Sequence, residues 1–426
     1  MRKIINDPVF GFINIPNDFV YSIIQHPYFQ RLTRIKQLGV IHLVYPGAQH
    51  TRMSHSLGAM HLMSEAISQL RSKDHVITPE EEDAALACIL MHDLGHGPFS
   101  HVLEDTLVTE ISHEEISLML MEKMNDTLGG QLSTAIAIFK NEYPKRFLHQ
   151  LVSGQLDVDR LDYLRRDSFF TGVTEGNIGS ARIIKMLNIH DDRLVVEVKG
   201  IYSIENFLMA RRLMYWQVYL HKTALAAERM LINVLKRAQE LTCHCGLDGG
   251  GLCEQGVAGQ ARNDNKVPSL FASPALQYFL HNKVDKHTFL TDPQALEHFA
   301  HLDDNDIWSA LKVWSQHEDK VLSLLSLGLL NRRLFKIEVE LQPFSPEYIA
   351  EKRQHLEEKH NLSPEELNYL VASNEITSNM YNEADDSIDI LYKNGTTKNI
   401  AEASDMLNIQ LLSKKVKKYY LCFLRS

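Results

Sequence analysis

The stretch from Ser203 to Leu241 contains neither proline nor glycine. Because these two residues are the usual breaks in a helix, their absence predicts one or two long helices here. A second helix is predicted over His55–Arg71, where apolar residues recur at helical spacing: Leu57, Met60, Met63, Ala66 and Leu70. Strand patterns are few before residue 240, so we expect a mainly α fold with an all-helical core.

Local signals mark where two further helices begin. A Thr-Pro-Glu-Glu segment precedes a helix predicted over Glu80–His92, which Gly95, Gly97 and Pro98 should end. Ser112 and Glu115 form a capping box ahead of the segment ISLMLMEKM. Residues 1–240 are therefore expected to form one helical domain.

The composition and the hydrophobic periodicity of the sequence change after residue 240 and again after residue 330. Residues 241–268 are rich in glycine and polar residues, which predicts a flexible loop. Three cysteines and one histidine of this loop are candidate ligands of a zinc site, namely Cys243, His244, Cys245 and Cys253. A C-x-C spacing is unusual for a zinc site, however, so a flexible loop is favoured. Helical periodicity returns over 269–330 and indicates an extension of the core. From 331 to 426, strand-like segments and the turn signal KNGTT predict a small α+β domain.

Charge and composition narrow the environment and the partners. The 426 residues include 54 acidic and 44 basic side chains, a formal net charge of −10. Nucleic acid is not an expected partner, because binding the phosphate backbone favours a basic face. No apolar stretch approaches the ~20 residues that cross a bilayer, and no signal segment is evident. The five cysteines do not form a disulfide framework. We expect a cytoplasmic protein that does not bind membranes.

Three segments concentrate histidine and aspartate. They are RMSHSLG, MHDLGHGPFSH and QLDVDRLDYLRRDSFFTG, which contribute His55, His92, Asp93, His96, His101, Asp157, Asp159, Asp162 and Asp167. The adjacent His92 and Asp93 stand at a predicted helix end, where the glycines allow both side chains to turn toward one locus. Imidazole and carboxylate groups from several helices would make a mixed nitrogen and oxygen metal site. Such a site suits Fe, Mn, Zn, Co or Ni, and Mg less well.

The His-Asp pair has two other interpretations. His92 and His96 have the spacing of a zinc-protease helix, but Asp93 replaces the required glutamate and the glycines end the helix. A surface pair at a helix C-terminus is also possible, since a histidine is favourable there. The preceding apolar run AALACILM and the other two segments argue against a surface pair. Spacing alone does not decide which aspartate of the third segment would bind the metal.

In order and approximate spacing, four segments resemble the HD-domain phosphohydrolases, in particular the deoxynucleoside triphosphate (dNTP) triphosphohydrolase branch. They are RLTRIKQLGVIHLVYPGAQHTRMSHSLGAMHL, HDLGHGPFSH, LDVDRLDYLRRDSFFTG and VYLHKTALAAERML. The resemblance covers about residues 1–240. It implies a helical HD-domain core that binds one divalent metal ion through His55, His92, Asp93 and Asp159. Asp157 and Asp162 are the rivals of Asp159.

The resemblance also implies roles around the metal. It assigns catalytic roles to His96, His101, Glu104 and His113, and proton transfer to the pair His101 and Glu104. Binding of the triphosphate falls to Arg52, Arg160, Arg211 and Tyr163, and Lys222 flanks the motifs. Contact with the deoxyribose falls to Gln37, Leu38, Asp167 and Tyr219, with Asp167 on the 3′-hydroxyl and Tyr219 on the 2′ side. Composition alone would place Leu38 and Tyr219 in the core, and Arg165 and Arg166 in a structural ion network.

The implied reaction is hydrolysis of a dNTP at the α-phosphorus by a metal-bound water, giving a deoxynucleoside and tripolyphosphate. The alternatives are an HD nucleotidase or phosphodiesterase acting on nucleoside monophosphates or cyclic nucleotides, and a non-catalytic nucleotide-sensing scaffold. Because members of this family commonly form dimers or tetramers, the resemblance also implies a homo-oligomer of one of these sizes. The resemblance places Thr33 where the vertebrate enzyme uses an arginine for its regulatory nucleotide, and we expect no SAM domain before the core. Regulation by GTP in the vertebrate manner is therefore not expected.

Overall fold

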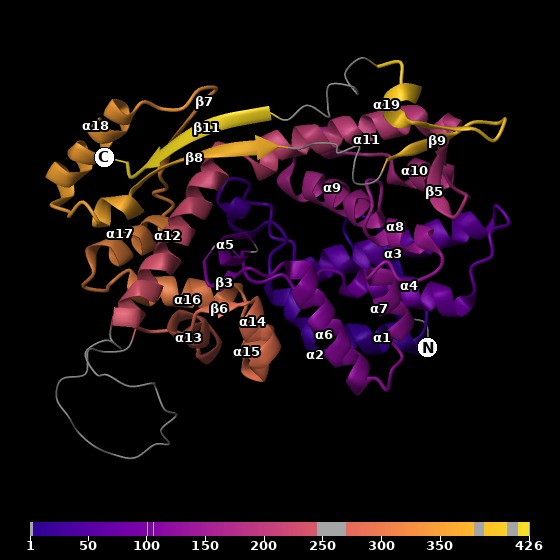
Figure 1. Cartoon of the computed structure of the whole chain (residues 1–426), viewed down its shortest axis with the longest axis horizontal. Helices are drawn as coiled ribbons and strands as arrows, with labels where there is room; N and C mark the ends of the chain where they lie inside the picture. Colours follow the sequence, from indigo (N-terminus) through magenta and orange to yellow (C-terminus); the bar gives the residue numbers. More distant parts are fainter. Residues whose placement is uncertain are drawn as a thin grey trace. The chain divides into compact units, whose positions relative to one another are not determined.

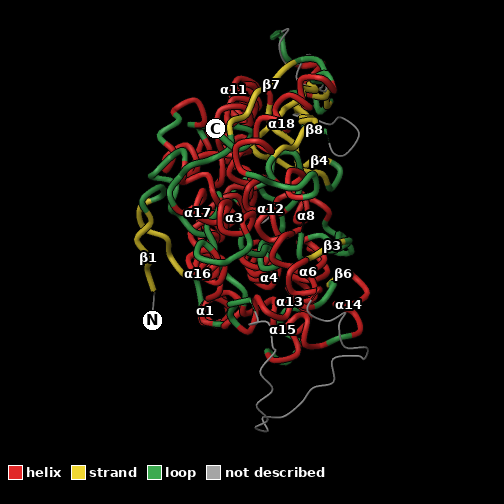
Figure 2. Tube along the Cα trace, turned by 90° about the vertical axis from the view of Figure 1, so that its left-hand side faces the viewer, coloured by secondary structure: helices red, strands yellow, loops and turns green. Residues whose placement is uncertain are grey.

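The computed structural model describes residues 3–99, 101–104, 106–244, 270–378, 387–406 and 416–425. Figures 1 and 2 trace a chain dominated by helices, with a few short strands. The chain divides into two compact units. Unit 1 comprises Met1–His96, Ser112–Ala224 and Glu375–Lys418, and unit 2 comprises Gly97–Ile111, Leu225–Asn374 and Tyr419–Ser426. The mainly helical fold predicted from the sequence is confirmed.

Unit 1 contains most helices of the first half of the chain, including those predicted over His55–Arg71 and Glu80–His92 and after Ser112, and one short helix near the C-terminus. Their bounds are α1 Asp18–Gln25, α2 Pro27–Gln30, α3 Arg52–Arg71, α4 Pro79–Met91, α6 His113–Thr127, α7 Ser133–Phe139, α8 Arg146–Val152, α9 Val158–Thr171, α10 Ser180–Met186, α11 Ile201–Met214 and α19 Ile400–Ala403. Short 3₁₀ turns cover Arg31–Arg34, Gly39–Leu43, Thr174–Gly176 and Val198–Gly200, and a π-helical turn covers Tyr215–Tyr219.

The helix starts follow from local capping. The side chain of Thr78 accepts a hydrogen bond from the backbone of Glu81, and the carboxylate of Glu81 accepts from the backbone of Thr78, so α4 begins in a complete capping box. The predicted capping box of Ser112 and Glu115 likewise starts α6. The long pattern without proline or glycine forms two helices, α11 and α12 (Lys222–His244), separated by the π-helical turn.

The interior of unit 1 is built around α3. This helix packs against both α4 and α9. Most of its residues are buried, including polar Arg52, His55 and Ser56. The burial of ionisable side chains on a central helix is unusual, because charged groups are rarely buried without partners. These side chains mark the candidate site.

Unit 1 also contains short strands. Those before residue 240 were not predicted, whereas those after residue 331 lie in the region where strand-like segments were predicted. Strands β1 Lys3–Asp7 and β2 Gly11–Ile15 form an antiparallel hairpin. A four-stranded sheet has the order β10-β9-β5-β4, with bounds β4 Leu187–His190, β5 Arg193–Glu197, β9 Asp389–Leu391 and β10 Thr397–Asn399. Strand β9 pairs with β5 in parallel, at Val196 and Ile390, so a segment from the C-terminal region completes a sheet of unit 1.

Unit 2 combines helices with two small sheets. Its helices are α5 His101–Glu104, α13 Pro274–His281, α14 Lys286–Thr291, α15 Pro293–His301, α16 Asp304–Trp314, α17 Lys320–Leu330, α18 Pro346–His360 and most of α12, with a 3₁₀ turn at Glu366–Tyr369. Strand β3 Val108–Thr109 pairs in parallel with β6 Val284–Asp285. A three-stranded sheet has the order β7-β11-β8, with bounds β7 Lys336–Glu340, β8 Val371–Ser378 and β11 Val416–Phe423.

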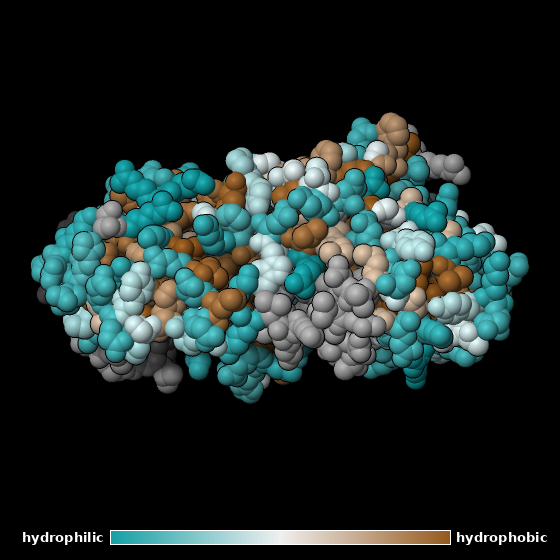
Figure 3. Space-filling view, turned by 90° about the horizontal axis from the view of Figure 1, so that it is seen from above, coloured by the Kyte–Doolittle hydropathy of each residue, from teal (hydrophilic) through white to brown (hydrophobic). Residues whose placement is uncertain are grey.

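The segment boundaries predicted at residues 240, 268 and 330 stay predictions, and they do not coincide with the division between the two units. The loop predicted over 241–268 falls, from residue 245 on, outside the described residues. Among the helices that the structure describes, none combines the length and apolar character needed to cross a membrane. Figure 3 shows one face of the molecule, where polar residues predominate and apolar ones are scattered between them.

Candidate active site

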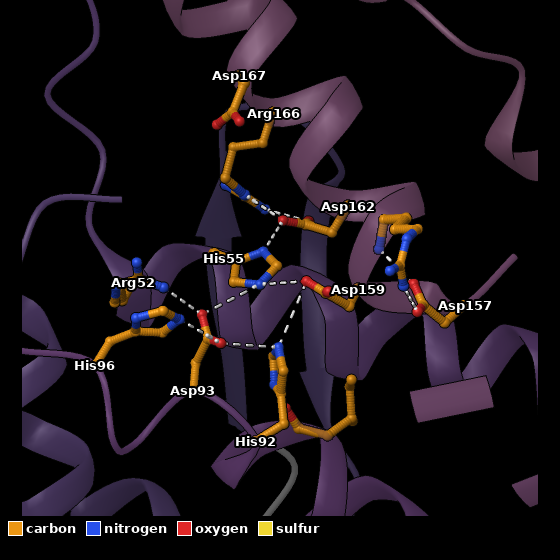
Figure 4. A network of polar contacts seen from close by, with 12 residues as sticks. Arg52, His55, His92, Asp93, His96, Asp157, Asp159, Asp162, Arg166 and Asp167 are labelled. Atoms are coloured by element: carbon orange, nitrogen blue, oxygen red, sulfur yellow. Dashed lines mark hydrogen bonds and ion pairs between the residues drawn. The ribbon is translucent and has the colours of Figure 1, made fainter. Parts of the chain in front are cut away.

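His55 stands on the first turn of α3 and has no exposed surface. Its Nδ1 lies 2.7 Å from Oδ2 of Asp162. Its Nε2 points the other way, 3.0 Å from Oδ1 of Asp159 and 3.7 Å from Oδ2 of Asp93 (Figure 4). One nitrogen of the imidazole is therefore fixed by a buried carboxylate, and the other faces two more carboxylates.

His92 and Asp93 follow the last residue of α4. Nδ1 of His92 lies 2.7 Å from the carbonyl oxygen of Ile89, and its Nε2 lies 3.3 Å from Oδ1 of Asp93 and 3.4 Å from Oδ1 of Asp159. Ser117 on α6 fixes the turn, since its hydroxyl donates to the carbonyl of His92 and accepts from the amide of Gly95. A Cβ at Gly95 would overlap the backbone of α6, so glycine permits this close approach.

The aspartates at the start of α9 have three different surroundings. Asp157 caps the helix and accepts from the amides of Arg160 (2.7 Å) and Gly154 (2.9 Å). Asp162 lies one turn further along, completely buried against His55. Of these three aspartates, only Asp159 faces the Nε2 atoms of both His55 and His92. One ligand atom each from His55, His92 and Asp159 lie within 4.8 Å of one another, which is a suitable spacing for a shared metal ion.

The charges of the cluster are closely coupled. Burial lowers the pKa of His55, but the carboxylates of Asp159 and Asp162 outweigh burial and raise that pKa to about 10. Burial also lowers the pKa of His92, but Asp93 and Asp159 raise it by more. The net effect is a raised pKa. In turn, burial raises the pKa of Asp159 but the two imidazoles lower it more, well below its usual range. Without a cation, protons on the imidazoles balance the carboxylates.

This donor set fits a divalent metal ion. The Nε2 atoms of His55 and His92 are buried and make no hydrogen bond within the part of the chain that the structure describes. Both point at the oxygens of Asp93 and Asp159 (Figure 4). Two imidazole nitrogens and two carboxylates make a mixed set that suits first-row transition metals.

Basic and aromatic groups surround Asp93. Nη1 of Arg52 lies 2.6 Å from Oδ2 of Asp93, and Nε2 of His96 lies 3.4 Å from Oδ1. The ring of His96 stacks on that of His113, with centroids 3.9 Å apart. Burial and then the charge of Arg52 lower the pKa of His96 to about 3, so this imidazole is neutral at physiological pH. The side chain of His101 lies outside the described residues, and Glu104 stands on α5 of unit 2.

Two of the predicted phosphate-binding arginines are held by the loop before α9. Arg160 donates to the carboxylate of Asp157 and to the carbonyl of Gly154. Arg211, on α11, donates to Oε1 of Gln155 at 3.0 Å. The Nε atoms of both arginines are buried without a hydrogen-bond partner among the described residues. Gly154 and Gln155 therefore position two guanidinium groups that still have donors to offer.

The predicted sugar contacts cluster in part. Asp167, near the end of α9, accepts a hydrogen bond of 2.7 Å from the hydroxyl of Tyr219. Tyr163 lies beside Tyr219, with ring centroids 6.2 Å apart, and burial raises the pKa of Tyr163 to about 12. Gln37 and Leu38 are half-buried and lie just before the 3₁₀ turn Gly39–Leu43. Lys222 begins α12.

His50 was not predicted to belong to the site, yet its Nε2 lies 2.7 Å from Oδ1 of Asp167. It lies in the segment PGAQHTRMSH, but no spacing rule connects it with a residue on α9. Arg166 was expected in an ion network, and this is confirmed, since it donates to both oxygens of Asp162 and to Asp7.

Comparison with known proteins agrees with this geometry. The HD domain model matches residues 52–167, and the HD associated region matches residues 178–245. A phosphohydrolase from Bacteroides thetaiotaomicron, whose crystal structure is known, is 64% identical, with a TM-score of 0.92 and full coverage of both chains. The uncharacterized protein YwfO of Bacillus subtilis is 30% identical over 80% of this chain and 73% of its own length.

A helical core that gathers a His-Asp pair, a further histidine and a further aspartate defines a class of hydrolases. The chain belongs to the HD-domain phosphohydrolase family. Within that family it is related to the deoxynucleoside triphosphate triphosphohydrolase SAMHD1. It is 28% identical to the human protein, over 56% of this chain and 45% of that protein.

Proposed function

We propose that this protein is a metal-dependent dNTP triphosphohydrolase, which cleaves a dNTP to a deoxynucleoside and tripolyphosphate. The observation that carries the proposal is the convergence of His55, His92, Asp93 and Asp159, with Arg52 bonded to Asp93 at the edge of the cluster. A cation site next to a guanidinium is suited to a phosphate substrate. The relationship to SAMHD1 favours a dNTP over other phosphate esters.

In this proposal His55, His92, Asp93 and Asp159 hold one divalent ion, either Fe, Mn, Zn, Co, Ni or Mg. When bound, such an ion acidifies a water molecule and offsets negative charge on phosphate oxygens. Asp162 and the carbonyl of Ile89 hold the two imidazoles through their other nitrogens, so that both Nε2 atoms stay directed at the ion.

The remaining side chains bind and orient the substrate. Arg52, Arg160 and Arg211 would grip the triphosphate, because a guanidinium can donate to two phosphate oxygens at once. Tyr163 would donate its hydroxyl to the same group. The catalytic roles of His96, His101, Glu104 and His113 stay predictions, with His101 and Glu104 assigned to proton transfer to the leaving oxygen.

Sugar selection would come from Gln37, Leu38, Asp167 and Tyr219. If the ring of Tyr219 closes the 2′ side of the sugar, a ribose 2′-hydroxyl would be buried without a partner. That costs about 1–3 kcal/mol, which corresponds to a preference of roughly fivefold to 150-fold for deoxynucleotides.

The test is turnover of each dNTP and rNTP with each of the divalent metals added in turn. Tripolyphosphate, pyrophosphate and orthophosphate are separated by ion chromatography. We expect tripolyphosphate and a deoxynucleoside in equal amounts. Release of orthophosphate alone would instead favour a nucleotidase or phosphodiesterase. Tight dNTP binding without turnover under any metal would favour a nucleotide-sensing scaffold. Analytical ultracentrifugation of the same preparation tests the expected dimer or tetramer.

A further inference from the structure

His50 connects two segments that the proposed function assigns to the sugar. Its side chain has no exposed surface and lies against the ring of Phe170, with centroids 4.5 Å apart and planes inclined by 18°. Its Nε2 lies 2.7 Å from Oδ1 of Asp167, across 117 residues of sequence. Its Nδ1 has no hydrogen-bond partner in the residues that the structure describes. The stacking fixes the plane of the imidazole, and Asp167 fixes the direction of its Nε2.

The carboxylate of Asp167 is held at both oxygens. Oδ1 faces His50, and Oδ2 accepts from the hydroxyl of Tyr219 at 2.7 Å. Burial and the charge of Asp167 raise the pKa of Tyr219 well above its usual range, so the hydroxyl keeps the proton that it donates. With both hydrogen bonds present, the carboxylate of Asp167, which is 1% exposed, has no freedom to rotate.

The backbone of His50 holds the other sugar segment. Its carbonyl oxygen accepts a hydrogen bond of 3.0 Å from the amide of Gln37. A bridge between Lys36 and Thr51 and a 3.0 Å bond from the amide of Arg52 to the carbonyl of Ile35 continue this pairing. Oε1 of Gln37 is buried and, among the described residues, has no hydrogen-bond partner. The side chain of Gln37 is thus available to a ligand while its backbone is fixed.

We propose that His50 is a positioning residue for sugar recognition, which fixes the carboxylate of Asp167 and the backbone of Gln37 relative to each other. The inference rests on the proposed function, because Asp167 and Gln37 are assigned there to the deoxyribose. His50 itself does not contact the substrate. Its effect is to keep Asp167 in the one orientation that accepts a hydrogen bond from a 3′-hydroxyl.

The test compares two variants that differ by one methylene. In His50→Gln the longer amide can place its N–H near the position of the imidazole Nε2. In His50→Asn the same amide is too short to reach Asp167. Both variants lose the stacking on Phe170, so a purely packing role would make them equally defective. His149→Phe, which replaces a half-buried histidine bonded to the carbonyl of Ile138, serves as a control away from the site.

The readout is the ratio of kcat/KM for a dNTP to that for the matching 2′,3′-dideoxynucleoside triphosphate, which lacks the 3′-hydroxyl. We expect His50→Asn to lower this ratio about tenfold, the usual effect of one lost hydrogen bond to a charged group, with most of the change in KM. His50→Gln should restore most of the ratio, and His149→Phe should leave it unchanged. Thermal unfolding of the three variants shows whether each is folded.

Two failures can be told apart. If the wild-type protein turns over no dNTP with any metal, the proposed function is wrong and this inference is wrong with it. If the wild-type protein is active but His50→Asn keeps the wild-type ratio, or falls together with His50→Gln, only the positioning role is wrong. A His50→Asn variant that does not fold leaves His50→Gln as the test, and a lowered ratio in that variant despite normal stability would also contradict the role.

Discussion

Nδ1 of His55 and Oδ2 of Asp162 lie 2.7 Å apart, and neither side chain has any exposed surface. Asp162 is held in turn by Arg166, which donates to it from Nε and Nη2 at 2.9 Å each, and Arg166 also bonds to Asp7. In this series of contacts from His55 to Asp7, each buried charge has a partner of opposite charge, as buried ions require. These contacts direct Nε2 of His55 toward Asp93 and Asp159, where we propose that the metal ion binds, and they lie outside that proposed site.

We expect Asp162→Asn to lower metal affinity by about 10–100-fold, the usual effect of changing a group that orients a metal-binding histidine. The substitution conserves volume but removes the charge that selects the position of the proton on His55. Metal content after dialysis against graded chelator concentrations measures the loss. Circular dichroism controls for folding. A variant with wild-type affinity would show that the orientation of His55 does not depend on Asp162.

Substitution of His92 or Asp93 by alanine should abolish hydrolysis and leave the helical fold intact. Each change removes one predicted metal ligand at the end of α4, where the turn is held independently by Ser117. Turnover and bound metal are measured together. The matched control is His61→Ala on α3, which removes a half-buried imidazole with its 3.7 Å ion pair to Glu65 and its ring contact with Phe10, but no residue of the candidate site. Retained turnover in either of the first two variants would contradict the site assignment.

Gly58→Ala should destabilise unit 1 by about 1–3 kcal/mol, although alanine is normally the better helix former by about 1 kcal/mol. A Cβ at this position would overlap the carboxylate of Asp162 and the guanidinium of Arg166. Because Asp162 also bonds to Nδ1 of His55, a shift of Asp162 would disturb that contact. Gly179→Ala is the control, because its Cβ would meet only the Cβ of Arg182, at 3.9 Å. Denaturant unfolding gives both free energies, and equal values would refute the steric argument.

The stability of α4 should depend on pH through Glu81. Burial disfavours its ionised form, but Lys145, Thr78 and Tyr143 overcome burial and lower its pKa. A lowered pKa stabilises the fold above the pKa of the unfolded chain, ~4.3, and the stabilisation is lost as the pH falls through the folded value. Glu81→Gln should therefore cost about 1–3 kcal/mol at pH 7 and progressively less below about pH 4.

Unfolding curves of the wild-type protein and Glu81→Gln at several pH values test this dependence. Glu142→Gln, which alters an exposed pair with Lys140, should give a smaller difference at pH 7. A cost of Glu81→Gln that stays constant from pH 7 to pH 3 would show that the carboxylate charge is not responsible.

Features encoded locally could be predicted from the sequence. The capping boxes at Thr78 and Ser112 lie within four residues of the helices that they start, so α4 and α6 were predicted near their observed bounds. The long helices α11 and α12 required only the absence of proline and glycine. The π-helical turn between them was not predictable, because the sequence there contains no breaker.

Features that depend on contacts between distant parts of the chain were harder to predict from the sequence. Spacing alone could not rank Asp157, Asp159 and Asp162, because their surroundings are set by the position of His55 on another helix. The resemblance favoured Asp159, which faces both imidazoles in the structure. His50 was missed because its partner Asp167 is 117 residues away. The short strands β4 and β5 were missed because an alternating pattern of four or five residues is weak beside strong helical signals.

Helix α9 carries Asp159, Asp162, Arg166 and Asp167 at intervals of three, four and one residues. Each residue turns an α-helix by about 100°, so a single insertion or deletion between Asp159 and Asp167 would swing one end of this array away from the other. Substitutions on the opposite side of α9 would leave the array aligned. Over evolutionary time this helix should therefore tolerate changes of side chain but not changes of length.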